Sequence, residues 1–468
     1  MDVMRDRIPL DDLIRGFAEA VAMNEGCAYY VGGAVRDLLF DVPTKDLDIE
    51  VAGISKETLE ILISVFFSEE AVRPEGIPYG IYHLPDFDPE YDIQIGLPRI
   101  EKRTGPGHRD LEVSVVPGLS PVAAASRRDF TMNAMRMNIL TGRLEDPYGG
   151  RADMKNHILR AVDPERFPQD PLRVLRAAEF AARFGLEPDE ELIEAGKKAD
   201  LSTLSRERVE AELRKGLLSD EPSRFFKVLR DMEQEEPWFH ELTMLRGIPQ
   251  DPSFHPEGDV YTHTMMVIDR AAARRTESED PWRLLFLALT HDFGKMHTTF
   301  EKDGRIHAYD HEETLGPAMN FVRRLTDDPE LERYLKNMIP LHMKPNQMAM
   351  AGSRITKTNH AFDEAMSPRD LLIFAAADRW IAVSEEESER YDLFLEERLR
   401  RYESLDPDEL ITGKDLQEMG IPEGPHYREL LAFARNLWLA ETKREGALKQ
   451  VRAEAGMLLR NPPAKPQQ

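Results

Sequence analysis

The sequence has little of several features that mark common classes of protein. It contains one cysteine, Cys27, among 468 residues, so no intramolecular disulfide can form and a reducing cytoplasm is the expected location. Its longest apolar run, Leu284–Leu289, falls short of the roughly 18 residues that a membrane helix needs. The N-terminal segment lacks the apolar stretch of a signal peptide, and no internal repeat is found. We therefore expect no membrane association.

Basic residues are also scarce relative to acidic ones. Lys and Arg number 61 against 86 Asp and Glu, which gives a formal net charge of −25. This balance excludes a protein that coats nucleic acid through charge alone, although local basic patches could still hold RNA. Cys27 begins the segment Cys27–Val31, which predicts a buried strand. We therefore do not expect a reactive thiol.

What is present indicates a globular chain of several domains. Hydrophobic residues make up 41% and charged residues 31% of the sequence. The chain is longer than a domain with a single hydrophobic core usually is. The first 155 residues mix strand and helix patterns, whereas apolar residues recur with helical spacing from Pro171 onward. Strands are predicted at 29–31, 46–51, 92–95, 111–116 and 133–140, and helices at 57–67, 171–184, 206–218 and 222–232. The domains expected are 1–155, 156–250, 251–400 and 401–468, with a linker at 250–258 and a disordered end at 461–468.

A pair of carboxylates follows a glycine turn near the N-terminus. Gly32 and Gly33 lie between a predicted strand and a predicted helix, where backbone N–H groups can approach a phosphate. Strand alternation then places Asp46 and Asp48 on one face, with Leu47 and its apolar neighbours on the other. Two carboxylates so spaced on a rigid strand can hold the divalent ions of a two-metal site. Either feature alone is most often structural, and their succession is what points to phosphate chemistry.

Several further motifs continue this pattern in a fixed order. Gly32–Asp37 and Asp46–Asp48 are followed by Arg127–Ala134, Glu145–Gly150, Gln169–Ala177, Leu204–Arg214 and Ile411–Ile421. Together they resemble the class II nucleotidyltransferases, the family of CCA-adding enzymes and bacterial poly(A) polymerases. The resemblance spans most of the chain. It implies an α+β nucleotidyltransferase head with a mixed sheet, followed by an all-α neck, an HD domain and a helical tail.

The resemblance also implies roles for individual residues. Asp46 and Asp48 would be catalytic and bind Mg²⁺, so that an RNA 3′-hydroxyl attacks the α-phosphate of a nucleotide and pyrophosphate leaves. Asp170 and Arg173, spaced as i and i+3 on a helix, would read the base of CTP or ATP in place of a template. The remaining nucleotide-binding positions expected are Gly32, Gly33, Arg36, Asp37, Arg127, Arg128, Asp129, Asn133 and Arg176, with Asp129 and Asn133 holding the loop.

The chain departs from the family pattern at three positions. Gln169 stands where many members have glutamate, and Glu179 where many have arginine. Gln94 occupies a position where relatives often show a third acidic residue, and Asp92 lies on the same strand face two residues away. These departures leave nucleotide preference and the third acidic group open.

The second helical region carries a separate set of metal-binding residue types. His263, His291, Asp292 and Asp378 resemble the ordered ligands of the HD phosphohydrolase superfamily. Imidazoles and carboxylates suit a divalent transition metal that activates water against a phosphoester. His311 and His342 are candidates for a second ion. The resemblance implies phosphatase and 2′,3′-cyclic phosphodiesterase activities, with a domain that only supports tRNA as the alternative.

These features leave three hypotheses for the chain, as a monomer or homodimer. The first is complete CCA addition to tRNA from CTP and ATP, with a phosphohydrolase domain attached. The second is CC-only, A-only or poly(A) addition, the last disfavoured because no arginine-rich extension is present. The third is a phosphohydrolase whose head has degenerated into an RNA-binding module, as Gln94, Gln169 and Glu179 would suggest.

Overall fold

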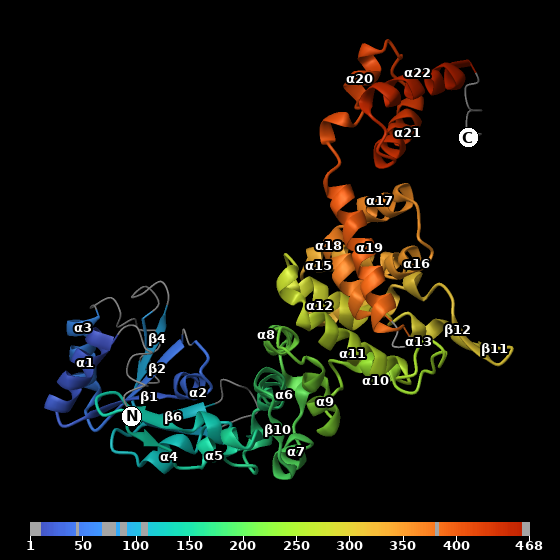
Figure 1. The fold of residues 1–468 in the computed structure, drawn as a ribbon. Coiled ribbons are helices and arrows are strands. Elements are labelled where there is room, and N and C mark those ends of the chain that lie inside the picture. Colours follow the sequence, from blue (N-terminus) through green and yellow to red (C-terminus); the bar gives the residue numbers. More distant parts are fainter. Residues whose placement is uncertain are drawn as a thin grey trace. The chain divides into compact units, whose positions relative to one another are not determined.

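The computed structural model describes residues 11–43, 46–67, 81–84, 91–103, 111–379 and 383–460 (Figure 1). It forms two compact units. Unit 1 comprises Met1–Gly216 and Arg224–Pro237, and unit 2 comprises Leu217–Ser223 and Trp238–Gln468. The four-domain boundaries predicted above stay a prediction, and the expectations for the N-terminal segment and for 461–468 lie outside the described residues.

Unit 1 is built on a mixed sheet, as the sequence predicted. The strands follow the order β3-β4-β2-β1-β7-β8. The β2·β4 pair is parallel and every other pair in this sheet is antiparallel. The bounds are β1 Cys27–Val31, β2 Asp46–Ala52, β3 Ile81–His83, β4 Asp92–Gly96, β7 Arg136–Asn138 and β8 Leu144–Glu145. This order brings β2 and β4 side by side, so their polar faces meet at one place.

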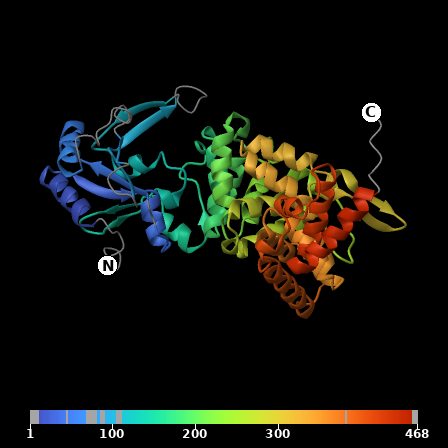
Figure 2. The same ribbon diagram turned by 90° about the horizontal axis from the view of Figure 1, so that it is seen from above.

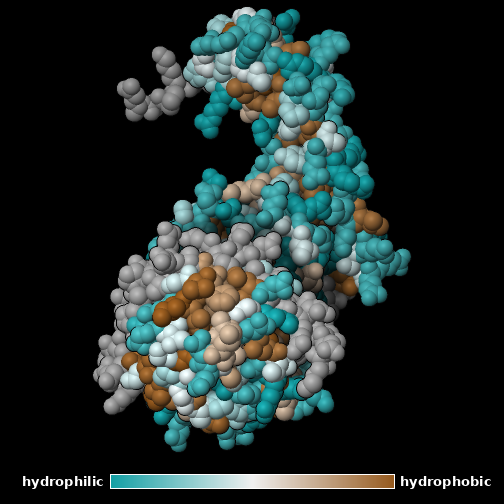
Figure 3. Space-filling model, turned by 90° about the vertical axis from the view of Figure 1, so that its left-hand side faces the viewer, coloured by the Kyte–Doolittle hydropathy of each residue, from teal (hydrophilic) through white to brown (hydrophobic). Residues whose placement is uncertain are grey.

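Helices cover the sheet because its central strand is apolar on both faces. Ala28 to Val31 are all buried in β1. In Figure 1, α1 (Asp11–Met23) and α3 (Lys56–Phe66) lie to the left of the sheet and α2 (Gly33–Leu39) to its right. Figure 3 shows a hydrophobic area on this side of unit 1, where Met23, Ile61 and Val65 are exposed on α1 and α3.

Two details of unit 1 differ from the sequence prediction. Cys27 begins β1 but is exposed, because it is the end residue of the strand rather than part of its buried stretch. The strand expected at 133–140 is shorter, since Thr131–Asn133 forms a 3-10 turn before β7. A separate hairpin joins β5 (Arg99–Arg103) to β6 (Leu111–Val115), and short helices α4 (Pro121–Ala125) and α5 (Gly150–Lys155) follow.

The rest of unit 1 is helical around α6 (Leu172–Phe184). Its apolar stripe is buried, and Phe180 packs edge-on against Phe130, with ring centroids 5.5 Å apart. Gly185 ends the helix in the left-handed conformation (φ 64°), which favours glycine. The other helices are α7 Glu190–Gly196, α8 Arg206–Leu217 and α9 Ser223–Asp231, and β9 (Ile158–Leu159) pairs with β10 (Glu187–Pro188). Helix α6 therefore reaches the loop that carries Arg127 to Asn133.

Unit 2 is mostly helical, as expected, with one β-hairpin that the pattern did not predict. The hairpin joins β11 (Thr299–Lys302) to β12 (Arg305–Ala308) and extends away from the helices in both ribbon views (Figures 1 and 2). The helices are α10 His240–Leu245, α11 Val260–Ala273, α12 Pro281–Thr290, α13 Lys295–Thr298, α14 Gly316–Leu325, α15 Pro329–Met338, α16 Lys344–Met350, α17 Ile355–Glu364, α18 Pro368–Ala377 and α19 Glu385–Glu403. The apolar segment of α12 is fully buried, as its sequence predicted.

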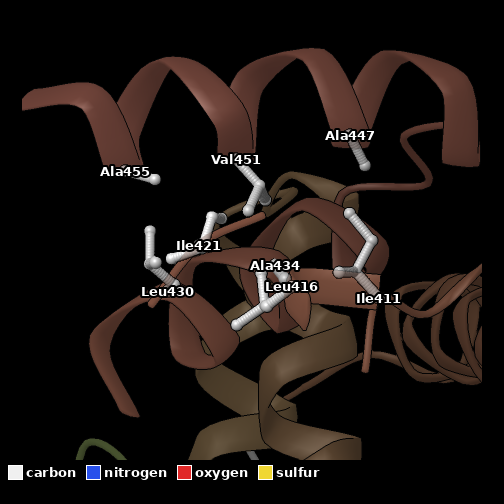
Figure 4. Close-up of a cluster of buried hydrophobic side chains, with 8 residues drawn as sticks. All are labelled: Ile411, Leu416, Ile421, Leu430, Ala434, Ala447, Val451 and Ala455. Atoms are coloured by element: carbon white, nitrogen blue, oxygen red, sulfur yellow. The ribbon is translucent and has the colours of Figure 1, made fainter. Parts of the chain in front are cut away.

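The tail has a small core of its own. Helices α20 (Gly413–Glu418), α21 (His426–Leu439) and α22 (Arg444–Arg460) enclose buried apolar side chains (Figure 4). In that view Ala447, Val451 and Ala455 point down from one helix onto Leu416, Leu430 and the residues around them. No helix among the described residues is both long and apolar enough to cross a bilayer.

Candidate functional site

Strand β2 presents its carboxylates along one face, as the sequence predicted. Leu47 and Ile49 are buried on the opposite face, which anchors the strand in the core. Glu50 is neutralised by Arg136, whose guanidinium lies 3.4 Å away. Asp46 and Asp48 instead line a cavity of about 530 Å³. Asp46 and Asp48 thus border the cavity, whereas Glu50 is paired with Arg136.

The surroundings of Asp48 disfavour its ionised form. Burial raises its pKa, and the charges of Asp46 and Asp92 raise it further, while Arg128 and Arg127 oppose the shift. A carboxylate whose charge is disfavoured by burial and by neighbouring acids is a suitable ligand for a divalent cation, because the cation offsets that repulsion. The chemistry of this pair therefore fits Mg²⁺.

The strand register bears on the third acidic group. Gln94 is the partner of Asp48 in the parallel β2·β4 pair, and Asp92 is the partner of Asp46. Gln94 is thus next to the metal-binding face but offers only an amide. Asp92 is the acid close enough to influence Asp48, and it is hydrogen-bonded to His83.

Gly32 forms the turn that the sequence predicted between β1 and α2. Its backbone has φ 65°, in the left-handed region that favours glycine. A Cβ at this position would lie 2.7 Å from Nη1 of Arg128, so any side chain would displace that guanidinium. Gly32 and Gly33 both line the cavity with Arg36. The turn therefore keeps a basic side chain close to the carboxylates.

A buried network behind this turn holds the cavity wall. Arg36 donates to Asp37 Oδ1 (2.7 Å) and Asn133 Oδ1 (2.9 Å) and lies over the ring of Phe180. Asp129 accepts from Asn133 Nδ2 (2.9 Å) and Arg176 Nε (2.7 Å). Burial opposes ionisation of Asp129, but Arg176 and these hydrogen bonds keep its pKa below the ordinary value. Arg36, Asp129, Asn133 and Arg176 line the cavity, whereas Asp37 supports Arg36 from behind.

Asp170 and Arg173 both reach the same cavity, although not from the same helix turn. The sequence predicted both on one helix, but Asp170 has an extended backbone and precedes α6. Its carboxylate accepts from the backbone N–H of Leu172 (3.3 Å) and faces Arg208 at 3.6 Å. Arg173 donates to the carbonyl of Arg127 at 3.0 Å. An acceptor and a forked donor are thus presented together to the cavity.

Glu179 is an acid buried in a cavity rich in arginine. It is 1% exposed, and Arg183 lies 3.6 Å from its Oε1, which accepts no hydrogen bond from any described residue. Burial, with repulsion from Glu212, raises its pKa to about 7. Glu212, Arg183 and Phe180 also line the cavity, and the sequence analysis gave none of them a role. Their helical spacing on α6 and α8 was visible, but nothing in one sequence shows that those helices face the carboxylates.

A second site lies in unit 2, where the four predicted HD-type ligands converge. His263 Nε2 is 2.9 Å from Asp378 Oδ1 and 3.8 Å from Asp292 Oδ2. His291 Nε2 is 3.2 Å from Asp292 Oδ2 and 3.5 Å from Asp378 Oδ1. These side chains come from α11, the end of α12 and the end of α18. The sequence order thus corresponds to one cluster in space.

The donor set of this cluster fits a divalent metal. His291 Nε2 and Asp292 Oδ1 are buried and form no well-directed hydrogen bond among the described residues. Although burial opposes it, the charges of Asp292 and Asp378 raise the pKa of His291 to about 10, so the cluster attracts a cation. A metal ion would supply that charge while leaving the imidazole nitrogen as a ligand.

His311 and His342 lie beside the other oxygen of Asp292. His311 Nε2 is 3.3 Å from Asp292 Oδ1 and 3.4 Å from His342 Nε2. This approach is possible because Gly294 has no Cβ, which would otherwise lie 2.0 Å from the carbonyl oxygen of His311. Asp292, His311 and His342 thus form a second group with metal-ligand spacing, sharing Asp292 with the first.

Three of these histidines are oriented in the same way by the backbone. The Nδ1 atoms of His291, His311 and His342 lie 2.9, 2.8 and 2.6 Å from the carbonyl oxygen three residues earlier. A carbonyl can only accept, so each Nδ1 carries a proton and each Nε2 faces the other groups of the cluster, where it can bind a metal. The sequence could not reveal this orientation, because it depends on backbone geometry.

Comparison with known proteins finds one family match in each of the two units. Residues 28–160 match the poly A polymerase head domain, and residues 260–382 match the HD domain. A multifunctional CCA protein of Actinobacillus pleuropneumoniae serotype 5b (strain L20) is 33% identical over 362 residues, 75% of this chain and 84% of that protein. A multifunctional CCA protein of Methylococcus capsulatus is 39% identical over 278 residues, but the match spans only 60% of its length.

Solved structures share the fold across nearly the whole chain. The Thermotoga maritima CCA-adding enzyme complexed with tRNA superimposes with a TM-score of 0.64 at 19% identity, covering 97% of both chains. The Bacillus stearothermophilus CCA-adding enzyme in complex with CTP gives a TM-score of 0.64 at 21% identity, covering 97% of this chain and 100% of that one. At an identity this low, the solved structures show only the fold. The family is shown by the Actinobacillus relative, because its identity and coverage are higher. The chain belongs to the multifunctional CCA protein family and is a nucleotidyltransferase that carries an HD domain.

Proposed function

We propose that this chain completes the 3′ end of tRNA by adding CCA from CTP and ATP, with unit 1 as the transferase. One observation carries the proposal: a single cavity brings Asp46 and Asp48 together with basic side chains and with Asp170 and Arg173. Nucleotidyl transfer needs these three elements, a metal-binding pair, cations for a triphosphate and groups that read a base. The single cysteine is consistent with a cytoplasmic location.

In the proposed reaction Asp46 and Asp48 hold Mg²⁺ against the nucleotide. When bound, Mg²⁺ lowers the pKa of the RNA 3′-hydroxyl and neutralises charge on the triphosphate. The 3′-hydroxyl loses its proton to solvent, and its oxygen forms a bond to the α-phosphorus as the bond from that phosphorus to the leaving pyrophosphate breaks. Asp48 on its buried strand keeps its position through the reaction, because the core residues beside it fix β2.

The surrounding residues would bind and select the nucleotide. Arg127 and Arg128, which line the cavity, would contact phosphate or ribose, and Gly32 and Gly33 would allow close approach of the backbone. Arg36 contributes positive charge while its hydrogen bonds to Asp37 and Asn133 hold it in place. Asp170 and Arg173 offer an acceptor and two parallel donors, which match the edges of cytosine and adenine.

A primer-extension assay tests this proposal and separates its alternatives. The full chain is incubated with CTP and ATP and with tRNA transcripts ending at the discriminator base, C, CC or CCA. We expect each incomplete transcript to be extended to CCA and no further, and the Asp46→Ala, Asp48→Ala double variant to extend none. Extension that stops after CC or begins only from CC would select a partial enzyme, and long A-tracts would select a poly(A) polymerase. Failure to extend any transcript would overturn the proposal.

We propose a second activity for unit 2, metal-dependent hydrolysis of a phosphoester. The convergence of His263, His291, Asp292 and Asp378 supports it, because these groups can hold a divalent transition metal that activates water. His311 and His342 would hold a second ion through the shared Asp292. We expect water to open a 2′,3′-cyclic nucleotide to the nucleoside monophosphate, and a phosphatase step then to release inorganic phosphate, with both steps lost in Asp292→Ala. Equal release by the variant would contradict it.

A further inference from the structure

The segment just before α11 folds back over one of the metal-site histidines. It comprises His255 to Asp259, of which 255–258 belong to the predicted linker. Asp259 caps α11 by accepting from the N–H (2.9 Å) and hydroxyl (2.7 Å) of Thr262, and its other oxygen accepts from the N–H of Gly247 (2.8 Å). Gly258 turns the chain with φ 117°. This local structure brings Glu257 back to His263, one turn into the helix.

Glu257 is buried against two imidazoles. Its side chain is 4% exposed, and its Oε1 lies 2.8 Å from His263 Nδ1 and 3.0 Å from His255 Nδ1. Its Oε2 is buried and accepts no hydrogen bond from any described residue. The ring of His255 packs edge-on against that of His263, with centroids 4.7 Å apart. His255 therefore holds the carboxylate in place and covers it from solvent.

This arrangement distinguishes His263 from the other histidines of the cluster. His291 and His342 direct Nδ1 to a neutral backbone carbonyl, and His311 does the same with Glu312 Oε2 farther off at 3.3 Å, whereas the direct partner of His263 Nδ1 is a carboxylate at 2.8 Å. A carboxylate acceptor fixes the proton on Nδ1, leaves Nε2 toward Asp378, and makes Nε2 a stronger metal donor than a carbonyl acceptor would. Such outer partners typically change metal affinity by about 10–100-fold when they are removed.

We propose that Glu257 is a positioning residue for the metal site of unit 2: it orients His263 and strengthens its Nε2 as a ligand, with His255 holding Glu257 in place. This inference rests on the proposed metal site. It assigns a role to the segment between unit 2's first helix, α10, and α11. It also predicts that this ligand can be weakened without changing any residue that binds the ion.

The test measures divalent metal binding by the full chain after removal of metal with a chelator. Isothermal titration with Ni²⁺, Co²⁺ and Mn²⁺ compares wild type with Glu257→Leu, which removes the acceptor, and Glu257→Gln, which keeps one acceptor oxygen but no charge. We expect affinity to fall about 10–100-fold in Glu257→Leu and by a smaller factor in Glu257→Gln. The visible absorption of the Co²⁺-loaded protein should change in the same order. Glu277→Gln, an exposed acid paired with Arg274 in the same unit, is the control and should leave both readouts unchanged.

The outcomes separate the two proposals. Unchanged affinity and spectrum in both Glu257 variants would overturn the role of Glu257 and leave the metal site standing. Wild-type protein that binds none of the three ions would overturn the metal site itself, and this inference with it. If Glu257→Leu fails to fold, as judged by circular dichroism, Glu257→Gln decides: affinity equal to wild type contradicts the proposal, and a reproducible loss supports it. CTP incorporation into tRNA should be unaffected by Glu257→Gln.

Discussion

The candidate site of unit 1 and that of unit 2 hold their charged groups in opposite ways. In unit 1 the carboxylates and guanidinium groups line a cavity of about 530 Å³ and face space that a substrate can occupy. In unit 2 the ligands are buried, and each histidine has one nitrogen engaged by a carbonyl or carboxylate. A site that exchanges a large anionic nucleotide must stay open, whereas a site that retains an ion gains by fixing its ligands beforehand. Under the proposed functions, similar residue types would transfer a nucleotide in unit 1 and retain a metal ion in unit 2.

Removing the carboxylates of β2 should abolish nucleotide transfer by unit 1 and leave unit 2 unaffected. We expect Asp46→Ala or Asp48→Ala to lower CTP incorporation by roughly 10³-fold or more, since charge stabilisation by the metal site is lost. Metal binding by unit 2 should not change. Asp12→Ala, an exposed acid on α1, is the control and should keep full activity. A variant with near wild-type incorporation would show that another group holds the metal.

The number of metal ions bound by the protein tests the candidate site of unit 2. The chain loaded with Ni²⁺ should bind up to two ions in unit 2, His342→Gln should lose one of them, and Asp292→Asn should lose both because Asp292 serves both ligand groups. Elemental analysis after gel filtration gives the stoichiometry, with Glu330→Gln on the surface of α15 as the control. Equal stoichiometry in wild type and His342→Gln would mean that His311 and His342 hold no ion.

The raised pKa of Glu179 predicts that the stability of unit 1 depends on pH. Its pKa rises from 4.5 to about 7 on folding, mainly through burial and then through Glu212. Between these values the folded state binds a proton that the unfolded state does not, so unit 1 should lose stability as pH rises through this window. Glu179→Gln should remove this loss, which is on the order of 3 kcal/mol above pH 7, and give little advantage below pH 4.5.

Hydrogen exchange of the α6 amides, followed by mass spectrometry between pH 5 and 8.5 and corrected for intrinsic exchange, measures this change in unit 1. The four tryptophans of the sequence, at positions 238, 282, 380 and 438, fall within the range Trp238–Gln468 of unit 2, so their fluorescence follows the unfolding of that unit. It should be the same in Glu179→Gln and wild type at each pH. Identical α6 exchange in the two proteins at pH 8 would contradict the raised pKa.

The smallest effect is expected for base selection. Asp170→Ala and Arg173→Ala should each reduce the preference for CTP and ATP over UTP and GTP by about 10–100-fold, because an unpaired polar edge costs about 1–3 kcal/mol. Ratios of kcat/KM for the four nucleotides measure this. Arg166→Ala, an arginine outside the cavity that pairs with Asp163, should leave the ratios unchanged. Unaltered ratios in both site variants would place base selection elsewhere.

Much of the fold was predictable because periodic patterns report which face of an element is buried. The alternation in β2 and the helical spacing of α6 and α8 agree with the structure. The β11–β12 hairpin was not predicted, since its residues are only partly buried or exposed and carry no clear alternation. Cys27 was predicted in the correct strand, but it was expected to be buried and is exposed. Patterns of this kind are weakest at the ends of elements.

The residue types and their order can be taken directly from the sequence: the glycine turn, the β2 carboxylates and the His and Asp candidates of unit 2. Which of these residues meet in space depends on the tertiary structure. It set Gln94 beside Asp48, buried Glu179 among arginines, and turned Glu257 back onto His263. The physical reason is that a metal or nucleotide site depends on distances between side chains far apart in the chain. Those distances follow from strand register, helix packing and backbone turns, which local pattern does not encode.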